Sequence, residues 1–592
     1  MTNPTAFYEE NIREYTRQVE KAQMQWLRVS TLRLLCFAAL CVAVYYWIKS
    51  GDAQWPLITI LCAAIFLWLV KIAFRLRDKK ALLEKLLFVN TNEIAIAQQQ
   101  PNGLGDGLQF EKGESYTSDL DIFGKGSLYQ LLNRTTTAHG SAQLAALLQE
   151  PLLKTDAIEN QQQAVKVLSE QKELRQLITA NGLLHSEKEG NLHDINSWLT
   201  MPSLLLHRKW LAVVRWLIPL YNLAALIYYI FTNDYKLLTL GALASWVIIG
   251  CFVKRINMQH LLLGKKQAIL QQYATILRLF SGADTGGSQL LQQEQSRATS
   301  AHLTIRKLSS LAGIFDQRLN MLVILFLNSF VMYDIQCMWA LEKWRTGNKE
   351  KFPEWIKCVG TIETLVSLAT YAFNSPAYVY PVIKPSPLAV KATALAHPLI
   401  PATVRVANDV DMGHAEQLVL VTGSNMSGKT TFLRAIGVNV VLAQCGVPVC
   451  AEQFAFSPMR IFTSIRVSDS LQEQTSYFMA ELKQLQFIIR NVQNGEPALV
   501  LIDEILRGTN SDDKTHGSEQ FIRKLLQYNC LTLFATHDLA LSVLEEELPG
   551  RISNYCFEST IRNNELLFDY TLQRGVAKNK NASFLMQKME II

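Results

Sequence analysis

The stretch from residue 419 to residue 434, VLVTGSNMSGKTTFLR, has the composition of a loop that binds phosphate groups. An apolar run leads into it, and the pattern GxxxxGK[ST] is complete from Gly423 to Thr430. Glycine lets backbone N–H groups turn toward phosphates, and the helix that follows adds a favourable dipole. We expect Lys429 to contact the β and γ phosphates of a nucleotide and Thr430 to hold Mg²⁺. The predicted nucleotide-binding residues are Gly423, Ser424, Asn425, Met426, Ser427, Gly428, Lys429, Thr430 and Thr431.

Two further apolar runs end in residues that suit nucleotide hydrolysis. The run ALVLIDE (498–504) ends in Asp503 and Glu504, and LTLFATHD (531–538) ends near His537. An aspartate at a strand end suits the shell of a bound Mg²⁺, and the adjacent glutamate would polarise the attacking water. A histidine at such a position would sense or stabilise the γ-phosphate. The predicted catalytic residues are Glu504, His537 and Lys429, and the predicted Mg²⁺ ligands are Thr430 and Asp503.

A sheet must bring these residues together. Short β-rich runs alternate with helical segments in the last third of the chain, and this alternation predicts a three-layer α/β domain with a parallel sheet. The predicted strands are 418–421, 498–502 and 531–535. Four prolines in NSPAYVYPVIKPSP (374–387) mark the boundary before this domain. Residues 115–200 and 257–376 show apolar side chains three and four positions apart, which predicts helices.

Four apolar runs form two pairs, 34–48 with 55–70 and 216–231 with 237–253. Each run has 15 to 17 residues, slightly fewer than the ~20 that span a bilayer. Flanking aromatic and basic side chains can extend each run, so we expect two transmembrane hairpins. The alternative is two buried helical hairpins of a soluble domain, and Pro219 and Asn222 weaken the transmembrane reading of the second pair.

Several basic residues lie just outside each pair of apolar runs. The loops within the pairs contain only two basic residues, Lys49 and Lys236. The positive-inside rule therefore places both chain ends and the bulk of the protein, with its predicted nucleotide-binding domain, in the cytoplasm, at an inner or plasma membrane. A third apolar run, 321–344, contains Asn328, Asp334 and Glu342. For this run we predict a buried core helix rather than a membrane span.

Composition limits the possible partners only loosely. The chain has 592 residues, 18% of them charged, with a net charge of +6 and a pI near 8.6. This balance permits a nucleic-acid or anionic-lipid partner but does not argue strongly for either. The ten cysteines are scattered without a CxxC pair, so neither a disulfide framework nor a zinc site is expected.

The order of phosphate loop, Asp-Glu strand end and strand-end histidine resembles that of the ABC-type ATPases, which hold nucleotide between two subunits. The LSGGQ signature of the transporter ATPases is absent, and residues 468–485 read SDSLQEQTSYFMAELKQL instead. TGSNMSGKTTFLR, SYFMAEL, LVLIDEILRGTNSDD and LTLFATHD resemble, in order and spacing, the MutS family of DNA mismatch-repair ATPases. LDIFGKGSLYQLLNRTTTAHGSAQLAALLQEPL is similar to that family's core domain, and FDYTLQRGVAKNKNASF to its closing hairpin and loop.

The resemblance implies an α/β ABC-type P-loop ATPase domain that follows a mostly α-helical core and lever region with two predicted transmembrane hairpins. The predicted domains are 1–110, an N-terminal region with a hairpin at about 34–74; 111–200, a MutS-like helical core; 201–256, the second hairpin; 257–385, the helical lever; and 386–592, the MutS-type ATPase domain.

The resemblance also implies ATP and Mg²⁺ as cofactors and a homodimer formed through the ATPase domains. Ser476 corresponds to the family's signature serine, which meets the γ-phosphate held by the other subunit, although Gln474 stands where the family usually has glycine. Ser424 and Ser427 replace a proline and a glycine of the usual loop. Gly428, Lys429 and Thr430 remain, so we expect nucleotide binding to persist.

Mismatch readers of this family carry a separate N-terminal domain with a Phe-x-Glu wedge. Phe7 and Glu9 have that spacing, but only about 25 residues separate them from the first apolar run, so we interpret this segment as the start of an amphipathic helix. The basic residues of the lever are spread out, which favours a solvated helix face over a specific DNA track. They are Lys265, Lys266, Arg306, Lys307 and Arg318.

Two functional hypotheses remain. The first is a membrane-tethered MutS-related ATPase that binds and hydrolyses ATP as a dimer and binds mismatched or branched DNA through its helical core. The second is a membrane-associated, ATP-driven remodeller or scaffold that has lost mismatch recognition and acts on a protein or lipid partner. An ABC transporter half is disfavoured because the signature is missing and the predicted spans are too few for a solute path.

Overall fold

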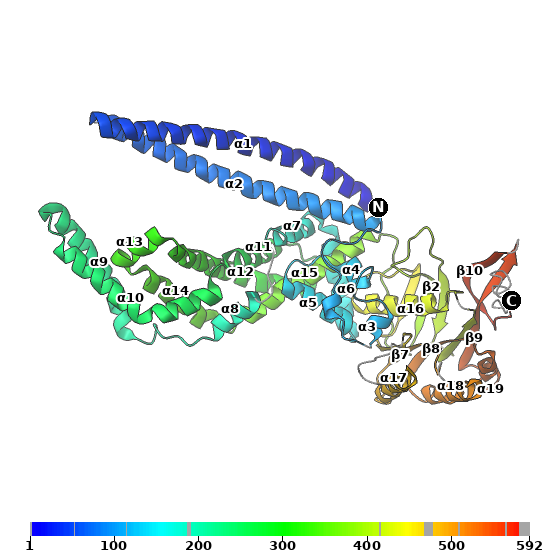
Figure 1. Cartoon of the computed structure of the whole chain (residues 1–592). Helices are drawn as coiled ribbons and strands as arrows, with labels where there is room; N and C mark the ends of the chain where they lie inside the picture. Colours follow the sequence, from blue (N-terminus) through cyan, green and yellow to red (C-terminus); the bar gives the residue numbers. More distant parts are fainter. Residues whose placement is uncertain are drawn as a thin grey trace.

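The computed structural model describes residues 3–52, 54–113, 115–185, 191–413, 416–424, 426–466, 477–506, 510–562 and 565–578. The chain is elongated: an α/β domain lies at one end, and long helices extend away from it (Figure 1). The helical part precedes the α/β domain in sequence, as predicted.

The N-terminal hairpin consists of α1 (Pro4–Ser50) and α2 (Gln54–Ala97). The Asn3 side chain accepts a hydrogen bond from the backbone N–H of Thr5, which caps the start of α1, and Gly51 ends the helix with a φ of 72°. The apolar runs occupy the half of the hairpin nearest the turn. Only 6% of the most apolar window of α1 and 11% of that of α2 is buried. The alternative of a hairpin buried in a soluble domain therefore disagrees with the structure.

The core and lever are helical. The core contains η1 (Leu108–Phe110), α3 (Tyr116–Asp119), α4 (Leu128–Leu132), α5 (Ala138–Gln149), α6 (Thr155–Glu170), α7 (Lys172–Gly182) and α8 (Asn191–Thr200). The second hairpin consists of α9 (Lys209–Thr232) and α10 (Lys236–Leu263). The lever contains α11 (Gln267–Ser281), α12 (Gln289–Asp316), η2 (Gln317–Leu319), α13 (Met321–Val331), α14 (Tyr333–Asn348) and α15 (Phe352–Asn374). Although α15 is apolar enough to span a membrane, 78% of its apolar window is buried, so it is a core helix.

The prediction of one buried helix over 321–344 is wrong. The run is broken at Met332, which has a φ of 52°. The polar residues that suggested burial form this break, because Asn328 Oδ1 accepts a hydrogen bond from the backbone N–H of Asp334 at 2.9 Å. Helix α14 is largely buried after the break, whereas α13 leaves Met321 80% exposed and Phe326 58% exposed.

The α/β domain has two sheets. The larger has the order β10-β9-β4-β8-β7-β6, in which only β10 runs antiparallel to its neighbour. Its strands are β4 (Leu418–Gly423), β6 (Arg460–Ser464), β7 (Ala498–Asp503), β8 (Cys530–Thr536), β9 (Ile552–Arg562) and β10 (Glu565–Arg574). A smaller sheet, in the order β1-β5-β2-β3, consists of β1 (Val382–Ile383), β2 (Val390–Leu395), β3 (Asn408–Met412) and β5 (Gln453–Phe456).

Alternating side chains of the larger sheet enter two separate cores. Val419 and Leu499 pack with α16 (Lys429–Gln444) on one face, and Leu420 and Val500 pack with the helices of the other face. The helices of that second face are α17 (Tyr477–Val492) and α18 (Ser511–Leu525), followed by η3 (Leu539–Val543) and α19 (Leu544–Glu547). The three-layer domain and its three central strands are confirmed, while the smaller sheet had no clear signal in the sequence.

Candidate nucleotide-binding site

The phosphate loop connects β4 to α16 and depends on two glycines with positive φ. At Gly423, with a φ of 152°, an added Cβ would lie 2.8 Å from the carbonyl oxygen of Phe557. At Gly428, with a φ of 107°, it would lie 3.1 Å from the Tyr570 ring. The Lys429 ammonium donates hydrogen bonds to the carbonyl oxygens of Gly423 and Ser424, both at 2.8 Å. The loop thus wraps around a buried cation; Asn425 lies outside the described residues.

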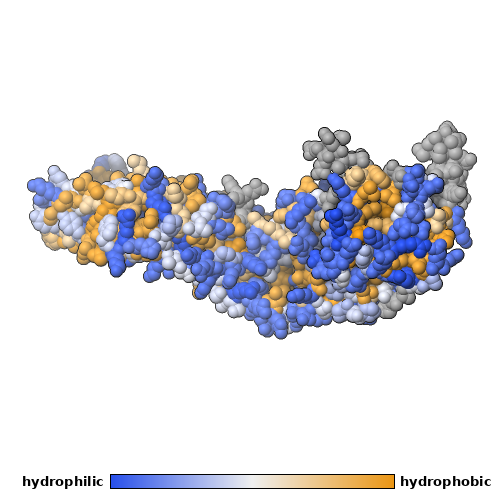
Figure 2. Space-filling model, turned by 90° about the horizontal axis from the view of Figure 1, so that it is seen from below, coloured by the Kyte–Doolittle hydropathy of each residue, from blue (hydrophilic) through white to orange (hydrophobic). Residues whose placement is uncertain are grey.

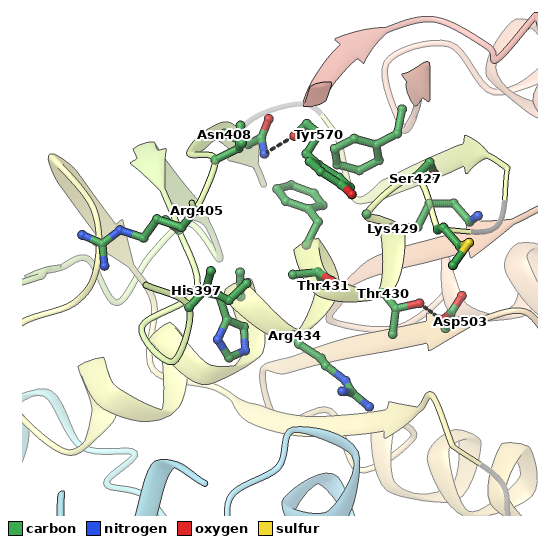
Figure 3. Close-up of a pocket in the computed structure, with 18 of the residues that line it drawn as sticks. His397, Arg405, Asn408, Ser427, Lys429, Thr430, Thr431, Arg434, Asp503 and Tyr570 are labelled. Carbon is green, nitrogen blue, oxygen red and sulfur yellow. Dashed lines mark hydrogen bonds between the residues drawn. The ribbon is translucent and has the colours of Figure 1, made fainter. Parts of the chain in front are cut away.

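The two predicted Mg²⁺ ligands meet beside this loop. The Thr430 hydroxyl at the start of α16 donates a hydrogen bond to the Asp503 carboxylate at the end of β7 (Figure 3). The register explains the meeting, because Asp503 pairs with Ala535 of β8 while Thr422 of β4 pairs with Thr536. A hydroxyl and a carboxylate are the oxygen ligands that Mg²⁺ prefers, and this ion usually keeps several water ligands as well. The residues present therefore fit the ion.

Glu504 and His537 lie next to each other, and His537 lies beside Lys429. The Glu504 carboxylate accepts a hydrogen bond from the ammonium of Lys514 at 2.5 Å, and its other oxygen lies 4.0 Å from His537 Nε2. His537 Nε2 lies 3.4 Å from the Lys429 nitrogen. Burial and the nearby Lys429 charge lower the pKa of His537, so this histidine is neutral at pH 7. The structure thus brings all the described predicted catalytic residues together.

Lys514 was missed in the sequence. It lies in the first turn of α18, within SDDK, where charged residues usually face solvent. The contact between the Lys514 ammonium and Glu504 becomes visible only in the folded structure, which brings the first turn of α18 back to the end of β7. This contact lowers the freedom of the one carboxylate suited to activating water.

A cavity of about 680 Å³ extends from the phosphate loop toward the segment between β2 and β3. Its volume lies within the range of small-molecule sites, ~300–1,000 Å³. His397, Asn408 and Tyr570 line the end away from Asp503 (Figure 3). Asn408 links β3 to β10 at this end of the cavity. Its side chain donates a hydrogen bond to the Tyr570 carbonyl at 3.0 Å and accepts one from the Leu572 N–H at 2.7 Å. Burial lowers the pKa of His397 to about 4.

The helical core contacts the same site through two carboxylates. Asp121 accepts hydrogen bonds from Arg434 of α16 at 2.9 Å and from Arg466, just after β6, at 2.7 Å. Asp119 accepts backbone hydrogen bonds from Ile465 and Arg466 at 3.0 and 2.8 Å. The core therefore fixes the position of Ile465 and Arg466, which come just before the segment that carries the predicted signature residues. Gln474 and Ser476 themselves lie outside the described residues.

The spread basic residues of the lever contribute partly to internal contacts. Lys266 pairs with Asp194 at 2.8 Å and Arg318 with Asp334 at 3.2 Å, while Arg306 and Lys307 are exposed on α12. These positions agree with a solvated, internally paired helix face. A DNA path along them stays a prediction.

A phosphate loop after one parallel strand, with an aspartate at the end of a nearby strand, defines the class of P-loop nucleotide-binding domains. Within that class, the family model of MutS domain V matches residues 419–589, and that of MutS domain III matches residues 111–311. The chain is therefore MutS-related in both its ATPase domain and its helical core. The domain III match also runs across the second hairpin.

Curated relatives agree with this relationship. The chain is 35% identical over 195 residues to MutS protein homolog 4 of Homo sapiens, which covers 31% of this chain and 20% of that protein. It is 32% identical over 230 residues to DNA mismatch repair protein MutS of Chloroflexus aurantiacus, covering 38% and 23%, respectively. The chain thus matches about a fifth of the length of these relatives.

Proposed function

We propose that this protein is a membrane-tethered MutS-related ATPase that binds and hydrolyses ATP with Mg²⁺ at the site on α16. The observation that carries the proposal is the convergence of Lys429, the Thr430–Asp503 pair, Glu504 and His537 from three parallel strand ends. Family resemblance adds that two ATPase domains pair, with Ser476 of one chain completing the site of the other.

Each residue has a role in the proposed reaction. Lys429 binds the β and γ phosphates, and the loop N–H groups hold them in place. Thr430 and Asp503 would hold Mg²⁺, which neutralises charge that develops on the phosphate oxygens. Glu504 orients the attacking water and accepts its proton once Lys514 no longer occupies the carboxylate. His537, neutral at pH 7, can donate a hydrogen bond toward the γ-phosphate without adding a second full cation beside Lys429.

The proposed membrane attachment rests on the two hairpins, whose helices are long and apolar enough to cross a membrane. The charge distribution favours a cytoplasmic ATPase domain at an inner or plasma membrane. DNA, mismatched or branched, is the proposed ligand of the helical core, because a relative that matches this chain is a DNA mismatch repair protein.

One observation favours a second function. The lever ends in exposed apolar helices rather than in a basic surface, as the orange side chains at the left of Figure 2 illustrate. A lever with this ending suits a remodeller or scaffold that moves a protein or lipid partner within the membrane.

Steady-state ATP hydrolysis by the full-length chain in nanodiscs tests the proposal. We would compare no addition, homoduplex, mismatched duplex and a four-way junction, each at low and near-physiological salt, because phosphate contacts are salt-dependent. Stimulation by one DNA form at physiological salt supports the DNA function. Hydrolysis that no DNA changes supports the remodeller, and absence of hydrolysis with Mg²⁺ in every condition contradicts the ATPase.

A further inference from the structure

Helix α13 is an exposed apolar element of the lever. Its sequence, MLVILFLNSFV, contains no charged residue. Leu322, Leu325 and Phe326 are 66%, 50% and 58% exposed, so they face away from the protein. The chain reaches α13 by a bend of 106° from α12, and α13 packs mainly on α10 and α9, with smaller contacts to η2 and α14 (Figure 1).

The end of α13 is capped by the middle of the second hairpin. Asn222, in the middle of α9, donates hydrogen bonds to the carbonyl oxygens of Ser329 and Phe330 at 2.9 and 3.1 Å. The Ser245 hydroxyl of α10 lies 3.0 Å from the same Ser329 carbonyl and 3.0 Å from the Gly241 carbonyl of its own helix, so it can donate to either. Both capping side chains are buried, at 1% and 0% exposure. The last carbonyl groups of a helix otherwise need water, so this cap suits a place that water does not reach.

The contact between α9 and α10 has the character of a membrane helix pair. Gly241 and Ser245 are four positions apart on α10, and a Cβ added at Gly241 would lie 1.9 Å from Asn222 Oδ1. Small residues at this spacing allow close approach of helices in lipid, and a polar side chain between them faces the bundle interior. Asn222, which weakened the prediction of a membrane span, is thus an interior residue that joins three helices.

A belt of arginine and aromatic residues lies at the protein end of this bundle. The Arg215 guanidinium lies over the Trp339 and Trp216 rings, 4.5 and 5.1 Å from their centroids. Gln336 and Arg215 are also hydrogen-bonded to each other. Tryptophan and arginine are typical of the interface between hydrocarbon and water. The cap at Asn222 is seven positions further along α9, about 10 Å beyond Arg215 at the rise of a helix.

We propose that α13 is a third membrane-inserted element, which enters the hydrocarbon beside α9 and α10 without crossing it and is held there by Asn222 and Ser245. With 11 residues, α13 is about 16 Å long, roughly half the thickness of the hydrocarbon layer. We expect lipid acyl chains to cover α13, because its large exposed side chains are apolar and two of its terminal carbonyls, those of Ser329 and Phe330, accept hydrogen bonds within the bundle. The proposal rests on the proposed insertion of the second hairpin.

Lipid contact can be measured with a fluorescent label at single cysteines in the full-length chain. The background would replace the four cysteines of the hairpins, Cys36, Cys41, Cys62 and Cys251, with alanine, after a check that ATP binding is retained. Phe326→Cys reports on α13, Leu223→Cys on the lipid face of α9, and Leu303→Cys on the exposed surface of α12. Each labelled chain is reconstituted at one copy per nanodisc, with nitroxide groups on the lipid acyl chains as quencher.

We expect the nitroxide lipids to quench the labels at 326 and 223 and to leave the label at 303 unchanged, with aqueous iodide giving the opposite pattern. A label at 326 that behaves like 303, while 223 is quenched by lipid, overturns the proposal and leaves the membrane anchor intact. Loss of lipid quenching at 223 as well contradicts the anchor itself. A label at 326 that neither quencher reaches means that protein covers α13, which also overturns the proposal.

The cap is tested by removing its hydroxyl. Ser245→Ala, combined with the label at 326, should increase quenching by iodide and decrease quenching by lipid, because α13 loses a contact that holds it in the bundle. Thr239→Ala is the matched control, since the Thr239 hydroxyl, among the residues that the structure describes, donates within α10 to the carbonyl of Lys236. Asn222→Leu should give a larger shift than Ser245→Ala. Unchanged quenching in both cap variants would show that these side chains do not hold α13.

Discussion

The two apolar hairpins have the same sequence pattern but are joined to the protein in different ways. The hairpin α1–α2 is fastened at its base, where Glu93 forms a two-bonded ion pair with Arg134 of the core and accepts a hydrogen bond from Asn374 of α15. The hairpin α9–α10 continues directly from the lever and is held in its middle by α13. The comparison indicates that the apolar pattern of the hairpins determines which surface is exposed, whereas a few buried polar groups determine where each hairpin is attached.

The attachment of α1–α2 should be the easiest part of this comparison to break. The Glu93 carboxylate is 2% exposed in the wild type. Arg134→Ala leaves this buried carboxylate without its cation, which typically costs ~3–5 kcal/mol. We expect a loss of this size in the free energy of unfolding, measured with urea in detergent. Arg460→Ala is the control, because both members of the Arg460–Glu496 pair are more than half exposed and such pairs contribute only ~0–1 kcal/mol. Equal effects of the two variants would contradict the role assigned to the buried pair.

Silencing the nucleotide site separates it from both hairpins. Lys429→Ala removes the buried cation of the phosphate loop, and we expect ATP binding to weaken by ~10²–10³-fold, as for the loss of one partner of a desolvated charge pair. Titration with a fluorescent ATP analogue measures this change. Flotation with liposomes should be the same as for the wild type, since none of the described residues that line the nucleotide cavity belongs to a hairpin. ATP affinity within a factor of two of the wild type would rule out this site.

Glu363, on α15, should make the stability of the folded protein depend on pH. Burial raises the pKa of Glu363 on α15 from 4.5 to about 7, although Thr136 and Thr137 donate hydrogen bonds to it. Folding therefore favours the protonated form. This contribution to stability is complete below pH 4.5 and is lost as the pH rises through 7, by about 3 kcal/mol.

Urea unfolding at pH 5.5 and pH 8 measures this effect as the difference between the wild type and Glu363→Gln. The wild type should lose more stability than the variant as the pH rises. Parallel pH profiles would show that Glu363 is ionised in the folded protein at both pH values.

Hydrolysis can be stopped while both hairpins and ATP binding remain. Glu504→Gln keeps the shape of the side chain but cannot accept a proton, so turnover should fall on the order of 10²-fold. ATP binding, followed by the same fluorescent analogue, should remain. Wild-type turnover in this variant would remove Glu504 from the reaction.

The smallest effect is expected at Lys514. Lys514→Gln removes the cation that holds Glu504 in this conformation, so we expect a rise of a few-fold in turnover without DNA or partner. Lys524→Gln, near the end of the same helix, is the control because its side chain is exposed and its position is about 15 Å from Lys514 along the helix axis. A fall in turnover would mean that Lys514 contributes to hydrolysis rather than restraining Glu504.

The sequence predicted the parts of the site that adjacent residues specify. Asp503 and Glu504 follow an unbroken apolar strand, and Gly423 to Thr430 follow another, so one sheet sufficed to bring them together. Lys514 and Asp121 were missed, because each meets the site only through the return of a helix or the docking of a separate domain. The error at α13 has a different cause: Asn328 and Asp334 bond to each other across a break, and their polarity was interpreted as burial of a continuous helix.

Both hairpins point their apolar ends away from the ATPase domain (Figure 1). If both hairpins insert into one bilayer, the membrane holds the protein at two places. One is the α1–α2 hairpin, whose base lies near the nucleotide site, and the other is the far tip of the lever. On the proposed function, a movement of the lever that ATP drives would change the spacing between two anchors in the same plane. The protein would then act on its partner along the membrane rather than across it.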